Sequence, residues 1–164
     1  MDLPNYEQHL KDWWTTLEDK RGMRARLRRA RTPDEVFILP EFHRGPVNYL
    51  RQRGVQVENT HLPALAFAVG LLAHARELST TSFPRLLANK EADKGGKEAS
   101  DHRFLRLMEV RDADAEQRYA MLRRLIDFVD KANVHSLLQA AFCWNDATRR
   151  NWAERYYTAL PQGE

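Results

Sequence analysis

Apolar side chains recur at steps of three and four residues along most of the chain, which is the spacing of one face of an α-helix. A first amphipathic helix with an aromatic face is marked by Leu10, Trp13, Trp14 and Leu17. The stretch from about residue 60 to 78 is apolar on most sides, which predicts a helix buried at the centre of a bundle. Because no segment alternates apolar and polar residues as a strand does, we expect an all-α fold.

Charged residues interrupt this pattern at length over residues 90–99, which contain a double glycine and no large apolar side chain. Such a composition is typical of a linker. We therefore expect two helical lobes, an N-terminal lobe over 1–92 and a C-terminal lobe over 98–164. Within the second lobe the pattern predicts a four-helix bundle, with Ser100 and Asn133 among its N-caps.

Positive charge is concentrated in one short segment. The chain carries 26 Lys and Arg against 23 Asp and Glu, a formal net charge of +3. Residues 20–31 alone hold seven basic residues and no acid, so the rest of the chain is net negative. This segment predicts a basic helix that buries Met23, Leu27 and Ala30 and exposes arginines on both flanks. Because so many like charges repel one another, contact with a polyanion is favoured over pairing with acids elsewhere on the protein.

The residues that follow the basic segment carry a helix-start signature. Thr32 is a candidate N-cap, Pro33 suits the first helical position, and Glu35 completes a capping box. We expect a short helix to begin here and to end before Pro40.

Further arginines are candidate contacts with a nucleic-acid backbone, because the guanidinium fork suits phosphate. Arg103 and Arg106 lie three residues apart on the polar side of their predicted helix, and Arg103, Arg124 and Arg149 have no obvious helical acid partner. The candidate contacts are Arg24, Arg28, Arg29, Arg103, Arg106, Arg124 and Arg149.

Two other arginines have acids at helical spacing and are weaker candidates. Arg123 has Asp127 four residues on, and Arg150 has Asp146 and Glu154 at the same spacing on either side. We expect ordinary surface ion pairs at both positions.

Large aromatic side chains can stack on bases, but most of those in this chain lie at core spacing on their helices. The group comprises Trp13, Trp14, Trp144, Trp152, Tyr156 and Tyr157. We expect a core role for most of them, and for Trp13 and Trp152 in particular.

No motif for catalysis is present. The six histidines are scattered without a His-x-x-x-His pair, and no phosphate loop or dinucleotide fingerprint occurs. The single Cys143 lies in an apolar helix end, which indicates a buried thiol and not a nucleophile. We therefore expect no enzymatic activity, no cofactor and no metal site.

No apolar run is long enough to span a membrane, for which about eighteen residues are needed. The N-terminus turns polar at once, so no signal peptide is expected. A cytoplasmic protein without a membrane partner is the expectation.

Several short motifs together resemble one protein family. They are GMRARLRRA at 22–30 followed by TPDE at 32–35, SDHRFLRL at 100–107, LRRLI at 122–126, FCW at 142–144, and then Arg150, Trp152 and Tyr156-Tyr157. In this order and spacing they are similar to the CasB small subunit of the type I-E CRISPR interference complex, Cascade. The resemblance covers nearly the whole chain, apart from residues 41–59 and the glycine-rich segment.

The resemblance implies a two-lobed helical subunit without enzymatic activity. It implies two copies in each complex, head to tail along the belly of a backbone that carries the guide RNA, next to other Cascade subunits. It also implies contacts with the hybrid of guide RNA and target DNA and with the displaced DNA strand, which help to hold the R-loop. By matching position, the resemblance assigns these contacts to Arg28, Arg29, Arg103, Arg124 and either Arg149 or Arg150.

Two other functions remain open from the residues alone. One is a stand-alone nucleic-acid-binding regulator whose basic helix enters a major groove, although that helix carries almost only arginine at its polar positions. The other is a helical scaffold that binds only protein, with its arginines matched to acidic partners.

Overall fold

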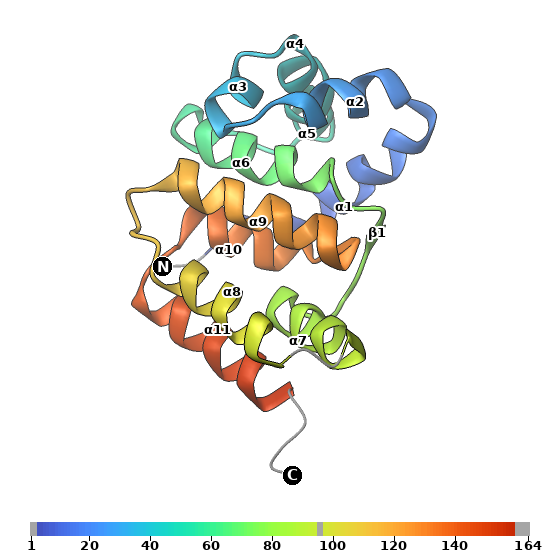
Figure 1. Cartoon of the computed structure of the whole chain (residues 1–164). Helices are drawn as coiled ribbons and strands as arrows, with labels where there is room; N and C mark the ends of the chain where they lie inside the picture. Colours follow the sequence, from blue (N-terminus) through green and yellow to red (C-terminus); the bar gives the residue numbers. More distant parts are fainter. Residues whose placement is uncertain (1–2, 95–96, 160–164) are drawn as a thin grey trace.

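The computed structural model describes residues 3–94 and 97–159, and helices dominate both ranges (Figure 1). The only strands there are two residues each, β1 (Glu77–Leu78) and β2 (Lys131–Ala132). The prediction of an all-α fold is confirmed.

The helices up to the centre of the chain are short. They are α1 (Glu7–Thr15), η1 (Thr16–Asp19), α2 (Arg21–Arg29), α3 (Pro33–Phe37), α4 (Pro40–Phe42), η2 (His43–Val47), α5 (Asn48–Gln52), η3 (Asn59–His61) and α6 (Leu62–Leu72). The later helices are mostly longer: α7 (Phe83–Lys94), α8 (Lys97–Met108), α9 (Ala115–Val129), α10 (Val134–Phe142) and α11 (Asp146–Ala159).

Helix α6 is the centre of the core. Its residues from Leu65 to Leu72 are all buried, as an apolar helix requires, and it packs against α3, α9 and α10. A side chain at Gly70 would collide with the Tyr119 hydroxyl of α9 and with Val36 of α3. The glycine therefore allows both helices to approach α6 closely. In Figure 1, α6 lies between the N-terminal helices and α9.

The chain leaves α6 earlier than the apolar pattern indicates. The predicted helix continues to about residue 78, but α6 ends at Leu72 and the chain becomes extended at β1. β1 pairs in parallel with β2, with Glu77 opposite Lys131 and Leu78 opposite Ala132. This short pairing ties the end of the α6 segment to the turn between α9 and α10.

Two predicted helix starts are confirmed by their hydrogen bonds. The Thr32 hydroxyl accepts from the Glu35 amide, and Glu35 Oε2 in turn accepts from the Arg31 amide at 3.1 Å. Asn133 Oδ1 accepts from the Ser136 amide at 2.8 Å, and Asn133 Nδ2 donates to the Ser79 carbonyl at 3.0 Å. Asn133 therefore caps α10 and also holds the chain that follows β1.

The predicted linker over 90–99 is wrong where the structure describes it, because α7 runs to Lys94 and α8 begins at Lys97. The physical reason lies at Glu91, which is buried and bound by Arg103 from α8. Helix α7 packs on α11, α8 and α9, so it joins the helices predicted to form the C-terminal bundle. The division into lobes 1–92 and 98–164 stays a prediction about folding units, and one continuous core includes residues from both.

Aromatic side chains fill much of this core. Trp13 and Trp152 are each 1% exposed, which confirms the core prediction for both. Tyr156 stacks on Phe104 with ring centroids 4.1 Å apart. Among the aromatic residues considered for base stacking, Tyr157 is the exception, since it is 41% exposed.

Candidate nucleic-acid interface

Helix α2 buries one face and exposes arginines on the other, as its pattern predicts. Leu27 is fully buried, whereas Arg21, Arg28 and Arg29 are exposed. Among the residues that the structure describes, none forms an ion pair or a side-chain hydrogen bond with these three guanidiniums. The most exposed charges of α2 are thus free to meet an external anion.

Arg24 has a structural task that its neighbours on α2 lack. Its Nε donates to the Ala73 carbonyl at 3.2 Å, and a terminal nitrogen donates to the Ala75 carbonyl. These carbonyls follow the end of α6, where helical partners are missing. Burial lowers the pKa of Arg24, and the charge of Arg28 lowers it further. Arg24 therefore anchors α2 to the core with part of its donor capacity.

Four arginines surround a hollow of about 350 Å³ beside α2, with no carboxylate in its lining. We name this group the α2 cluster; it consists of Arg21, Arg24, Arg28 and Arg76. Arg76 is highly exposed, and its Nε lies 3.8 Å from Asp130 Oδ1. Such an exposed ion pair contributes little. Guanidiniums gathered around one hollow produce a positive potential that attracts anions.

The other flank of α2 differs. Arg26 pairs with Glu41 at 3.0 Å, so its charge is compensated. Arg29 lies beside a hollow of smaller volume. Its lining includes Glu35, Leu39 and Ile38, and Ile38 is 75% exposed. The adjacent residues Arg28 and Arg29 thus face different surroundings.

A second arginine site lies between α8 and α9. We name it the α8–α9 groove; its volume is about 510 Å³ and its lining is Arg103, Arg106, Gln117, Ala120, Met121, Arg124, Leu125 and Phe128. Arg106 and Arg124 are exposed and form no side-chain hydrogen bond or ion pair with any described residue. Three of the arginines predicted from the sequence therefore meet here, from two different helices.

Arg103 has an acid partner on another helix, which spacing along its own helix could not show. The Nη1 atom of Arg103 lies 3.1 Å from Glu91 Oε1, and the Arg103 guanidinium lies 5.0 Å from the Phe128 ring centroid. Burial raises the pKa of Glu91, while the charge of Arg103 opposes that rise. Arg103 still lines the groove, but part of its charge compensates a buried carboxylate.

Arg149 is also paired, so the expectation of a free guanidinium is wrong. It binds Asp146 at 2.9 Å and Asp112, and it donates to the Val110 carbonyl at 3.3 Å. Its side chain is only 18% exposed, and its guanidinium lies 5.8 Å from the Trp144 ring centroid. Arg149 thus holds α11 to the loop before α9. The sequence could have predicted the pairing with Asp146, because Asp146 lies three residues earlier on the same helix.

The ion pairs predicted for Arg123 and Arg150 do not form among the described residues. Arg149 binds Asp146 instead of Arg150, and Asp127 lies 3.4 Å from His74 Nδ1. Helical spacing alone could not show that these pairs are absent, because Arg149 competes for Asp146 and His74 competes for Asp127.

His74 is a buried histidine close to α9, since its Nδ1 lies 3.4 Å from Asp127 Oδ1. Burial lowers the pKa of His74, Asp127 raises it, and Arg28 and Arg123 lower it again.

Sequence reasoning missed Arg21 and Arg76 as members of the α2 cluster. Arg21 was visible in the basic segment, whereas Arg76 comes close to α2 only through packing. Arg118 is different, because it is buried and donates to the Ala140 and Asp112 carbonyls at 2.9 Å and 3.1 Å. Burial lowers the pKa of Arg118 to about 10, so its role is structural.

Other site chemistry is sparse in the described part of the chain. No group of three His, Cys, Asp or Glu side chains there could hold a metal ion. Cys143 is buried, as predicted, and burial raises the pKa of its thiol. None of the helices described is both long enough and apolar enough to cross a membrane.

The fold and this surface define the class of the protein: an all-α protein with one hollow and one groove lined by several arginines. The family model of the CRISPR-associated protein Cse2 (CRISPR_cse2) matches residues 23–157. The chain belongs to this family, the Cse2 or CasB small subunit of type I-E Cascade. No curated protein matches the chain, and no solved structure does.

Family membership gives the protein its place in an assembly. It is a small, non-catalytic subunit of a CRISPR Cascade complex and assembles there with other subunits. The matched range begins within α2 and ends within α11, so it contains both the α8–α9 groove and most of the α2 cluster.

Proposed function

We propose that this Cascade subunit binds nucleic acid without sequence preference and thereby stabilises the R-loop, both the guide–target hybrid and the displaced DNA strand. One observation carries the proposal: four exposed guanidiniums without acid partners in the described chain line these two sites, Arg21 and Arg28 in the α2 cluster and Arg106 and Arg124 in the α8–α9 groove. Arginine binds phosphate through paired, charge-assisted hydrogen bonds.

The chemistry of the two sites suits a backbone contact and not a base-reading one. The α2 cluster offers only arginines, and phosphate contacts carry no sequence information. In Cascade the guide RNA reads the sequence by base pairing. Opening a duplex to form the R-loop is nearly balanced in free energy, so modest backbone contacts decide whether the loop persists.

The seven candidate arginines divide into two groups by their present partners. Arg28, Arg29, Arg106 and Arg124 are exposed without acids and are proposed as the main contacts. Arg24, Arg103 and Arg149 already bind carbonyls or carboxylates, so we assign them smaller contributions.

The α8–α9 groove adds an apolar floor to its charges. Met121, Leu125 and Phe128 lie in the same lining as Arg106 and Arg124. We assign to it a single-stranded segment, with phosphates at the guanidiniums and sugars or bases over the apolar side chains. Under this proposal the protein works in the cytoplasm, with a second copy of itself in the same complex.

The experiment measures how long an R-loop survives on a single tethered DNA target, with and without this subunit. We expect a shorter lifetime without the subunit and an intermediate lifetime with Arg106→Ala/Arg124→Ala. The matched control is Arg51→Ala/Arg111→Ala, which removes the same charge from exposed positions outside both sites. Equal lifetimes in all cases would refute the proposal and favour a scaffold that binds only protein. Guide RNA maturation should proceed unchanged without the subunit.

A further inference from the structure

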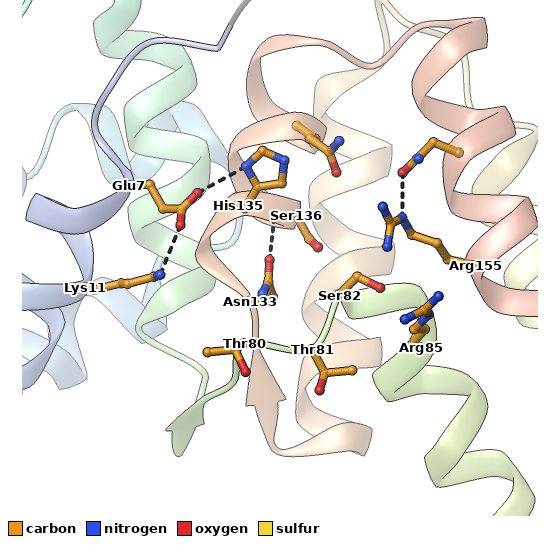
Figure 2. A pocket seen from close by; sticks show the side chains of 12 residues that line it. Glu7, Lys11, Thr80, Thr81, Ser82, Arg85, Asn133, His135, Ser136 and Arg155 are labelled. Carbon is orange, nitrogen blue, oxygen red and sulfur yellow. Dashed lines mark hydrogen bonds and ion pairs between the residues drawn. The ribbon is translucent and has the colours of Figure 1, made fainter. Parts of the chain in front are cut away.

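A polar pocket of about 720 Å³ lies where α1, α10 and α11 meet the start of α7 (Figure 2). It shares no residue with the α2 cluster or the α8–α9 groove. Neither the sequence motifs nor the proposed function uses it.

The one carboxylate in the pocket lining is already neutralised. Glu7 Oε2 lies 3.0 Å from Lys11 Nζ, and Glu7 Oε1 lies 3.1 Å from His135 Nδ1. Burial raises the pKa of Glu7, Lys11 and His135 lower it, and the balance is a lowered pKa. Each carboxylate oxygen therefore has a partner, and Glu7 offers little attraction to an incoming cation.

Two guanidiniums on the other side of the pocket lack a countercharge. Arg85 comes from α7 and forms no side-chain hydrogen bond or ion pair with the residues described. Arg155 comes from α11 and uses only its Nε, which donates to Asn151 Oδ1 at 3.1 Å. Figure 2 shows both on the side of the pocket opposite Glu7, Lys11 and His135. Because α7 and α11 pack against each other, the two arginines come from neighbouring helices.

Two side-chain amides in the lining use their oxygen as an acceptor and keep their amino group free. Gln139 Oε1 accepts from Trp152 Nε1 at 3.0 Å, and Asn151 Oδ1 accepts from Arg155, which fixes both amide orientations. The amino groups of Gln139 and Asn151 therefore remain as unused donors. The Ser82 hydroxyl is shielded from solvent and has no hydrogen-bond partner among the described residues.

We propose that this pocket binds a phosphate group through Arg85 and Arg155, with the amino groups of Gln139 and Asn151 as further donors. A pocket with two uncompensated guanidiniums, free N–H donors and no free carboxylate fits an oxyanion, and its donors match the oxygens of phosphate. The phosphate is either free or part of a nucleic-acid strand, since both present the same oxygens.

Calorimetric titration of the full chain tests the site, first with inorganic phosphate and separately with a short single-stranded oligodeoxynucleotide. Arg85→Gln/Arg155→Gln should weaken binding by at least about tenfold, because it removes charge-assisted hydrogen bonds. The control Arg51→Gln/Arg111→Gln removes the same charge elsewhere and should leave binding unchanged. An effect on inorganic phosphate assigns the pocket to free phosphate, and an effect on the oligonucleotide alone assigns it to a strand.

A second variant should keep the fold but place a negative charge in the pocket. Gln139→Glu retains the oxygen that accepts from Trp152 but replaces the free donor with a negative charge, so it should abolish phosphate binding in this pocket while thermal stability is preserved. If Arg85→Gln/Arg155→Gln and Gln139→Glu both bind the two ligands as tightly as the unchanged chain, the pocket is not a phosphate site. Arg106→Ala/Arg124→Ala should not change phosphate binding, which separates this outcome from failure of the proposed function.

Discussion

The α2 cluster and the α8–α9 groove present similar charges that are organised differently. Three members of the α2 cluster come from one helix, and its hollow is lined by four arginines and a small alanine. The groove draws its arginines from two helices and sets them around Met121, Leu125 and Phe128. The first site is a region of positive potential, whereas the second can combine charge with apolar contact. From this difference we expect the proposed ligand of the groove to be selected by shape more strictly than that of the cluster.

The largest expected effect tests whether the two regions share one core. Trp13→Ala, in α1, and Trp152→Ala, in α11, should each lower the free energy of unfolding by about 3–5 kcal/mol. Because the core is continuous, either substitution should unfold both regions together. Urea unfolding followed by far-UV circular dichroism and by fluorescence of the remaining tryptophans measures this. Two separate transitions would show instead that the regions fold independently.

The next effect separates anchoring from binding within the α2 cluster. Arg24→Ala leaves two backbone carbonyls without their donor and should cost about 2 kcal/mol of stability. Arg28→Ala, four residues on, removes an exposed charge and should cost less than about 0.5 kcal/mol. Thermal unfolding of the two variants gives the comparison. Equal stability of both would mean that Arg24 does not anchor α2.

A smaller effect compares the two sites as binding surfaces. Arg28→Ala/Arg29→Ala and Arg106→Ala/Arg124→Ala should each flatten the dependence of log affinity on log salt. The slope should fall by about 0.7 for each phosphate of a single strand that the variant no longer neutralises. Fluorescence anisotropy with single strands of different sequence, at several salt concentrations, measures both slopes. An unchanged slope for either variant would exclude that site as a phosphate-binding surface.

Lysine substitutions at the same positions sharpen this comparison. Arg28→Lys/Arg29→Lys should recover most of the affinity, because the α2 cluster contributes charge. Arg106→Lys/Arg124→Lys should recover less, because lysine lacks the planar guanidinium. The same anisotropy titrations measure the recovery. Equal recovery at both sites would remove the distinction drawn between them.

The smallest expected effect is a gain in the affinity of the α8–α9 groove for single strands. Glu91→Gln releases Arg103 from its carboxylate, so affinity for single strands should rise a few-fold and the salt slope should steepen by about 0.7. Glu41→Gln, which releases Arg26 on the compensated flank of α2, is the matched control and should change affinity less. No gain from Glu91→Gln would indicate that Arg103 does not face the ligand.

Glu91→Gln should also change how the stability of the protein depends on pH. Because burial raises the pKa of Glu91, the folded state holds this proton more tightly than the unfolded state does. Stability therefore falls as pH rises from the unfolded to the folded pKa of this carboxyl. Glu91→Gln should remove that part of the decline, which unfolding experiments between acidic and neutral pH can detect.

The sequence predicted the features that depend on neighbours along the chain. The basic helix was found because its charges are contiguous, and Thr32 and Asn133 were found because a cap acts within a few residues. Features that depend on packing were missed. Glu91 is charged, so its segment resembled a linker, yet α8 covers it and Arg103 compensates it. The groove was not predicted because no spacing in the sequence brings Arg106 and Arg124 together.

The short parallel pairing of β1 with β2 has a consequence for the order of folding. It joins residue 77 to residue 131, so the chain must close a long loop before either strand gains a hydrogen bond. Local helices form far faster than such a closure, so this pairing should form late and break early. Until it closes, Arg76 is not held beside Asp130, and the hollow beside α2 lacks one of its walls. We therefore expect the α2 cluster to be completed late in folding, so a half-folded chain should not present the finished cluster to an anion.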